Sequence, residues 1–189
     1  MDMKTKSLLL AGVLLVMASC SDTTGIRDIK GGYCYKTTGQ VTLKENYKGA
    51  TSADTMRLNL NNESGDLDII SLHNGDSLLI TLDQQNGNVC STRGILDDNT
   101  IHFESYSRTL SIPTETTKYD TFHIGTFPFK YDSIVSYKVY ETEVFDITVS
   151  GYAQTFDNTL MFYLDYKGKS QSSERTLSGS GIRMLAKKY

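Results

Sequence analysis

The sequence predicts an all-β domain whose strands follow one another as an antiparallel, up-and-down meander. Turn-forming pairs recur at nearly even spacing over residues 55–103, and they are Ser64-Gly65, Asn74-Gly75, Asn86-Gly87 and Asp98-Asn99. Such pairs accept the backbone angles that tight hairpins require. Between them apolar residues alternate with polar ones, as in Met56, Leu58 and Leu60. A period of two is typical of a half-buried strand and not of a helix.

In the first half of the chain, each predicted strand ends at a turn signal. Gly31-Gly32-Tyr33-Cys34-Tyr35 forms the opening strand, because aromatic residues suit a pleated, half-buried surface. The strands of the meander then cover residues 56–60, 67–72, 78–82, 89–92 and 100–103. Within 78–82, Leu78, Ile80 and Leu82 share one face, which is expected to point to the core.

The second half continues the same pattern. Residues 134–140 and 144–149 are rich in β-branched and aromatic side chains, and residues 160–166 alternate two faces of a strand. Asp157-Asn158 repeats the Asp98-Asn99 turn signal, so a second tight hairpin is expected there. Residues 175–186 form the closing strand, which is expected to bend at the glycines of Ser178-Gly179-Ser180-Gly181.

The N-terminal residues predict a targeting segment. An apolar run over residues 8–18 follows Lys4 and Lys6, and its eleven residues are too few to span a bilayer. Met17-Ala18-Ser19-Cys20 resembles the lipobox of bacterial lipoproteins. The resemblance implies cleavage before Cys20 and diacylation of this cysteine, which suffices for stable membrane anchoring. The alternative is an ordinary signal peptide with an incidental cysteine.

This interpretation divides the chain into three parts. Residues 1–19 are the signal peptide, residues 20–30 the lipidated N-terminus and tether, and residues 31–189 a single β-barrel-like domain. Cys34 and Cys90 remain after lipidation of Cys20. Because leftover cysteines often pair in an oxidising envelope, a Cys34–Cys90 disulfide is predicted. The alternative is two separate thiols.

The lipobox, the tether, the opening strand and the meander together resemble the lipocalin-like, or calycin-like, lipoproteins of Gram-negative envelopes. The resemblance implies a meander closed into a barrel that can enclose one small ligand. It also implies a location at the outer membrane, facing the periplasm or the cell surface. Tyr33 or Tyr35 would close the barrel under Arg183. A β-sandwich is the alternative, because the tract 114–132 could cross between two sheets.

Composition and motifs argue against several functions. The net charge is -3 and no basic block is present, which argues against nucleic-acid binding. His73, His102 and His123 lack the spacing of metal ligands, so neither a metal nor another cofactor is expected. No motif for a phosphate loop or a nucleophile occurs. The chain is therefore expected not to be an enzyme.

An aromatic cluster provides the one candidate binding site, besides the lipidation site. It consists of Tyr119, Phe122, Phe127, Phe129 and Tyr131. The cluster is either a core plug or strand crossover, or an exposed platform for an apolar ligand or a partner. A membrane-anchored binding module for a small apolar ligand or a partner is the expected function. The alternative is a structural or adhesive envelope protein that binds another protein.

Overall fold

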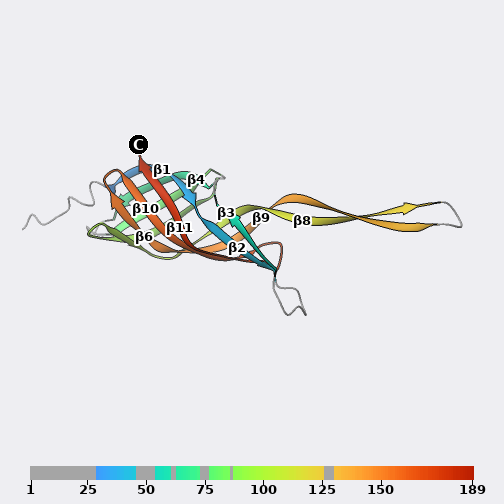
Figure 1. Cartoon of the computed structure of the whole chain (residues 1–189). Helices are drawn as coiled ribbons and strands as arrows, with labels where there is room; N and C mark the ends of the chain where they lie inside the picture. Colours follow the sequence, from blue (N-terminus) through green and yellow to red (C-terminus); the bar gives the residue numbers. More distant parts are fainter. Residues whose placement is uncertain (1–28, 46–53, 61–62, 73–76, 86, 126–129) are drawn as a thin grey trace, which may run out of the picture.

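The computed structural model describes residues 29–45, 54–60, 63–72, 77–85, 87–125 and 130–189. They form one antiparallel sheet (Figure 1), so the predicted all-β class is confirmed. The strands are β1 (Gly31–Thr38), β2 (Gln40–Glu45), β3 (Asp54–Asn59), β4 (Ser64–Ser71), β5 (Ser77–Gln84), β6 (Val89–Asp97), β7 (Thr100–Phe103), β8 (Tyr106–Ile124), β9 (Tyr131–Phe156), β10 (Thr159–Ser170) and β11 (Thr176–Lys188). Among these residues, no helix is long and apolar enough to cross a membrane.

Eight strands close into a barrel in the order β1-β4-β5-β6-β7-β9-β10-β11, and β11 pairs back with β1. Consecutive hairpins connect β4, β5, β6 and β7, as the turn spacing predicts. Ring closure runs from Tyr33 opposite Lys188 to Thr38 opposite Arg183. The barrel is consistent with a calycin-like fold, and the β-sandwich alternative is wrong.

Large side chains occupy the inside of the barrel. Alternate residues of each ring strand point inward, and Tyr33, Phe145 and Tyr166 are among the largest that are fully buried. Tyr33 donates a hydrogen bond from its hydroxyl to the carbonyl of Ile29 at 2.7 Å. The predicted cover by Arg183 is wrong: Arg183 points outward, and the Lys188 ammonium lies 5.9 Å from the Tyr33 ring centroid.

Local backbone features agree with the turn chemistry of the sequence. Asp98 and Asp157 adopt positive φ angles of 50° and 47° at the tight turns before β7 and β10. Asp tolerates this left-handed conformation better than most residues. The predicted bend in β11 is a bulge: Leu164 lies opposite Ile182, but Tyr166 lies opposite Gly179.

One end of the barrel continues as an open sheet. There β2 extends β1 and pairs with the first residues of β11, and β3 pairs with β2. A transverse row of paired residues crosses this section from Thr55 on β3 through β2, β11, β10 and β9 to Thr109 on β8. The edges of this section are therefore β3 and β8.

Beyond this section, β8 and β9 project as a two-stranded ribbon, which we call the arm (residues 115–125 and 130–140). Its pairing runs from Glu115 opposite Tyr140 to Ile124 opposite Tyr131. Ten residue pairs correspond to a length of about 30 Å. The C-terminus lies at the other end of the barrel (Figure 1). The tract 114–132 is thus no crossover between sheets, and β9 unites the two strands predicted over 134–149.

Candidate functional site: the arm and the groove at its base

The arm exposes large apolar side chains on both faces. The face that continues the inner surface of the barrel carries Phe122, Ile124, Tyr131, Val135 and Tyr137, which are 41–62% exposed. The opposite face carries Tyr119, Ile134 and Tyr140, which are 68–76% exposed. Contiguous exposed apolar side chains often mark an interaction site.

Three residues of the predicted aromatic cluster lie on the arm. Tyr119, Phe122 and Tyr131 are exposed, so for them the core-plug alternative is wrong. They do not form one platform, because Tyr119 lies on the opposite face from Phe122 and Tyr131. Phe127 and Phe129 lie outside the described residues. Binding by these aromatic side chains stays a prediction.

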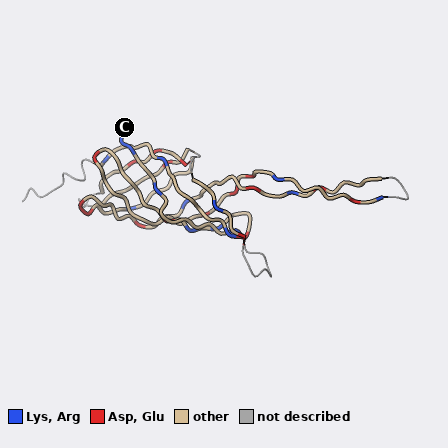
Figure 2. Tube along the Cα trace, viewed as in Figure 1, with Lys and Arg blue, Asp and Glu red and all other residues tan. Residues whose placement is uncertain are grey.

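Cross-strand contacts between polar and charged side chains connect β8 with β9 along the arm and at its base. Lys118 contacts Glu141, Lys138 contacts Glu115 and His123 contacts Asp132, each at 2.5 Å. The hydrogen bond from Lys138 lowers the pKa of Glu115. Figure 2 shows acidic and basic residues interspersed along the arm. The described residues of the arm carry three lysines and three carboxylates, so its surface is nearly neutral, with exposed apolar side chains between the charges.

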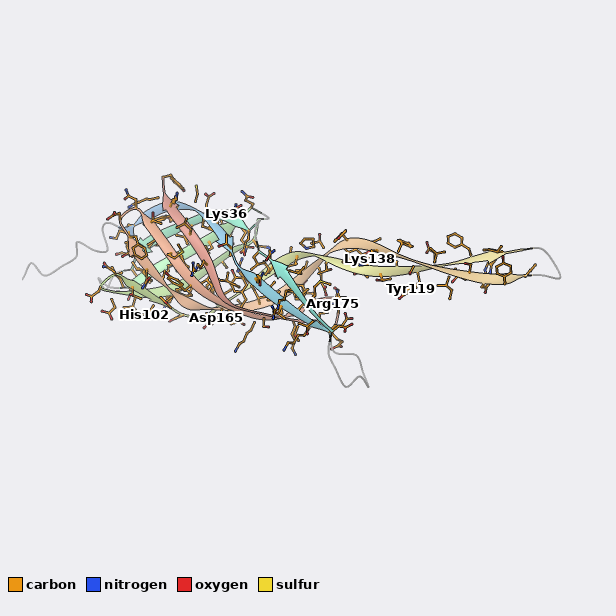
Figure 3. All side chains as sticks on the ribbon, viewed as in Figure 1. Lys36, His102, Tyr119, Lys138, Asp165 and Arg175 are labelled. Atoms are coloured by element: carbon orange, nitrogen blue, oxygen red, sulfur yellow. The ribbon has the colours of Figure 1, made fainter. Side chains whose placement is uncertain are left out.

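A groove of about 550 Å³ lies at the base of the arm, between the edges of β3 and β8. Figure 3 shows Arg175 at this base and Tyr119 farther along the arm. The groove therefore joins one predicted binding residue, Tyr119, to residues that are distant in sequence. Its lining residues are Leu43, Glu45, Asp54, Thr55, Met56, Glu115, Thr116, Thr117, Tyr119 and Arg175.

Arg175 fixes the wall of the groove through two carboxylates. Its guanidinium donates to Glu45 at 2.9 Å and to Glu143 at 3.0 Å. Ser170 and Ser173 each donate a hydroxyl hydrogen bond to Glu143 at 2.5 Å. Burial raises the pKa of Glu143, but the hydrogen bonds from Ser170, Ser173 and Arg175 together bring this pKa below its ordinary value. Glu143 is therefore held as an anion.

The lining of the groove is more acidic than basic. Glu45, Asp54 and Glu115 contribute carboxylates, whereas Arg175 is the one basic residue among the lining residues. Because Lys138 lies beside Glu115, the groove retains a moderate excess of negative charge. Such a lining suits polar or cationic groups better than a purely apolar ligand.

A second polar cluster lies inside the barrel, where sequence patterns did not indicate it. The Arg108 guanidinium forms an ion pair with Glu63 and donates a hydrogen bond to the Tyr166 hydroxyl at 2.5 Å. The Tyr166 hydroxyl lies 3.5 Å from the other Glu63 oxygen. Burial raises the pKa of Tyr166 well above its ordinary value, although Arg108 opposes this effect. The three groups partner one another, which gives the cluster a structural role.

The cysteines do not form the predicted disulfide. Cys34 is a free thiol on the outer surface of β1, and Cys90 is a half-buried free thiol on β6. Strands β4 and β5 separate the two residues around the barrel. The predicted Cys34–Cys90 bridge is therefore wrong, and the alternative of separate thiols holds. Cys20 lies outside the described residues, so its lipidation stays a prediction.

The histidines are not brought together. His102 points outward from β7, His123 pairs with Asp132 on the arm, and His73 lies outside the described residues. Within the described ranges, no group of three or more His, Cys, Asp or Glu side chains could hold a metal ion.

Comparison of the chain with protein-family models, with curated proteins and with solved structures gives no match in any of the three. The geometry therefore defines a class at the level of architecture. The chain is an eight-stranded, closed antiparallel β-barrel with additional strands outside the ring. The arm extends beyond this ring as the continuation of β8 and β9.

Proposed function

We propose that this chain is a lipid-anchored, non-enzymatic binding module of a Gram-negative cell envelope whose barrel presents the arm to a protein partner. The observation that best supports this proposal is the location of the apolar side chains. Inside the barrel, residues such as Tyr33, Phe145 and Tyr166 pack against one another, whereas on the arm Tyr119, Phe122 and their neighbours face solvent. A surface of this kind fits a partner better than the barrel interior fits a ligand.

The position of the chain ends supports an arrangement in which the arm points away from the membrane. β1 begins at Gly31, and its next residues pair with the C-terminal residues Lys187 and Lys188. Figure 1 shows the C-terminus at the end of the barrel that is opposite to the arm. A membrane anchor on Cys20 would thus attach the barrel at one end and direct the arm away from the membrane. The short tether over 20–30 would keep the barrel close to that surface.

The groove supports a second candidate function, the binding of a small ligand. Its volume of about 550 Å³ is in the range of small-molecule sites. The carboxylates of Glu45, Asp54 and Glu115 would favour a polar or cationic group over the apolar ligand expected from the sequence. The arm exposes a much larger apolar surface, so a protein partner remains the better-supported function.

Site-specific photo-cross-linking in intact cells tests the proposed function. p-Benzoylphenylalanine replaces Tyr131 on the arm or, as a matched control, Tyr152 on the outer face of the barrel, which is 40% exposed. A protein adduct that forms at position 131 and not at position 152 is the expected result. Absence of an adduct at the arm, or equal adducts at both positions, would contradict a role of the arm in binding.

The anchor is tested separately. Cys20→Ala should abolish metabolic labelling by fatty acid and release the protein from the membrane fraction. A mild change of the flanking tether, Thr23→Ser, should leave both unchanged. Acylation that persists in Cys20→Ala would contradict the anchor without affecting the role of the arm.

A further inference from the structure

The outer edge of β8 is available for pairing along the arm. In the part of the chain that the structure describes, β8 pairs over residues 115–124 with β9 alone. Its other edge therefore presents backbone N–H and C=O groups outward, as a template for another strand. An isolated two-stranded ribbon is also marginally stable in water, and additional strands would stabilise it.

The sequence of this edge is complementary to itself. When two copies of β8 lie antiparallel with Tyr119 opposite Tyr119, opposite charges and like polar side chains face one another. Lys118 faces Asp120, which joins opposite charges, and Thr117 faces Thr121, which joins two hydroxyl groups. Glu115 faces the His123 imidazole, and Thr116 faces Phe122. Each pair occurs twice because the arrangement has two-fold symmetry. Facing charges of opposite sign stabilise adjacent strands, and facing like charges destabilise them.

Neighbouring registers lack this complementarity. Centring the pair on Lys118 places two lysines opposite each other, and centring it on Asp120 places two carboxylates opposite each other. The register centred on Tyr119 is thus selected by charge. Lys118 contacts Glu141 in its own chain, and an ammonium group has three donors, so it can also donate to a carboxylate of another chain.

We propose that the arm binds a second copy of this chain through antiparallel pairing of the two β8 edges, centred on Tyr119. This inference rests on the proposed function and names its partner. The product is a continuous four-stranded sheet in the order β9-β8-β8-β9. It adds cross-strand neighbours for Tyr119 and Phe122, which are exposed in the single chain.

The groove fits this arrangement. In the proposed register Ile124 of the second copy lies opposite Thr114, next to the open section between β8 and β3. The ring strand β5 ends at Gln84 and β6 begins at Val89, so among the described residues neither strand extends the wall into this section. The arm of the second copy also has two strands. In the proposed register, the outer ends of these strands would lie at the groove of the first copy, which the described residues of β5 and β6 do not reach.

The arrangement also predicts where the two anchors lie. Antiparallel arms place the barrels at opposite ends of the pair, and the termini of each barrel lie on the side away from its arm. The two membrane anchors would therefore face opposite directions. Such a pair would bridge two membrane surfaces, which is the geometry of an adhesive contact.

A charge-exchange experiment on the mature chain tests the pairing by sedimentation equilibrium. K118D and D120K each place like charges opposite one another and should weaken dimerisation about tenfold. In an equimolar mixture of K118D with D120K, the mixed dimer places aspartates opposite lysines. This mixture should dimerise about as tightly as the wild type. The double variant K118D/D120K should also dimerise. K167D on the exposed face of β10 is the matched control and should behave as the wild type.

The rescue by mixing separates pairing from folding. K118D also removes the contact with Glu141 inside the chain, but that loss persists in the mixture, so restored dimerisation cannot come from it. Thermal unfolding of each variant confirms that the barrel is intact. Wild-type protein that stays monomeric, single variants that dimerise normally, or a mixture that stays monomeric would each overturn the proposal.

Bridging is tested with vesicles that carry the chain through an N-terminal hexahistidine bound to nickel-chelating lipid. Wild-type vesicles should aggregate and K118D vesicles should not, while mixed K118D and D120K vesicles should aggregate again. Dispersed wild-type vesicles would overturn the bridging arrangement. If the chain is monomeric but position 131 still cross-links to a different protein, the self-pairing is wrong and the proposed function stands. If the chain is monomeric and position 131 forms no adduct, both are wrong.

Discussion

The barrel and the arm share strands β8 and β9, but the side chains on one face of these strands are buried in the barrel and exposed on the arm. Along the first half of β8, the inward residues Tyr106, Arg108, Leu110 and Ile112 are buried. Along the second half, Tyr119 and Phe122 are exposed, although the pairing with β9 continues without interruption. Strand formation is therefore not what buries a residue. Burial depends on the other ring strands, which close over one face of β8 and end before the arm begins.

This difference implies that the barrel carries the folding energy and that the arm is a displayed surface. A buried large apolar side chain stabilises a fold by about 1.5–3 kcal/mol relative to exposure. The arm makes no such contribution through Tyr119, Ile134 or Tyr140, which remain mostly exposed. Substitutions in the two regions should thus have effects of very different size.

The largest effect is expected for the buried ion pair. Arg108→Ala should lower the free energy of unfolding by about 3–5 kcal/mol, because it leaves Glu63 without its cation beside the buried Tyr166 hydroxyl. Arg93→Ala, on the exposed face of β6, is the matched control and should change stability by less than about 0.5 kcal/mol. Urea unfolding measures both. A loss below about 1 kcal/mol for Arg108→Ala would contradict a structural role of the cluster.

A pair of phenylalanines compares the two regions directly. Phe145→Ala in the barrel should cost about 3–5 kcal/mol, because it removes a fully buried ring. Phe122→Ala on the arm should cost less than about 0.5 kcal/mol, because that ring is half exposed. Equal losses in thermal or urea unfolding would mean that the arm is part of the core.

A smaller effect on stability, which depends on pH, is expected for substitution of Glu143 near the base of the arm. Its pKa is below the ordinary value in the folded protein, so its contribution to stability is complete above the carboxyl pKa of the unfolded chain. The contribution falls as the pH drops through the folded pKa. Glu143→Gln should therefore be less stable than the wild type at pH 7, and the difference should shrink on acidification. A difference that grows on acidification would contradict the ion pair with Arg175.

Much of the barrel was predictable because its signals are local. The Asp98-Asn99 and Asp157-Asn158 turns, and the alternation through Leu78, Ile80 and Leu82, depend on residues that are close in sequence. The bend in β11 was readable from its glycines for the same reason. Ring closure was expected from the resemblance to calycin-like lipoproteins and not from these local signals, which left a β-sandwich as the alternative.

The arm and the polar clusters were not predictable in the same way. The composition of residues 115–140 is that of an ordinary strand and does not indicate an exposed ribbon. The distribution of apolar residues over both faces does differ, because Tyr119 lies on the opposite face from Phe122 and Ile124. That loss of one-sided alternation is the signal that could have indicated an exposed ribbon. Arg108 and Glu63 lie 45 residues apart, and no spacing rule relates them. The wrong disulfide has the same origin, because no local signal shows that β4 and β5 separate the strands of Cys34 and Cys90 around the barrel.

The most direct test of the account is urea unfolding of a variant without the arm. Asn-Gly replaces residues 117–138, so that the paired residues Thr116 and Val139 flank a two-residue turn. Because the barrel carries the folding energy, the free energy of unfolding should stay within about 0.5 kcal/mol of the wild type, measured at concentrations where both are monomeric. A loss of several kcal/mol, or a barrel that no longer folds, would show that the arm is part of the folding core and would contradict the division between barrel and arm.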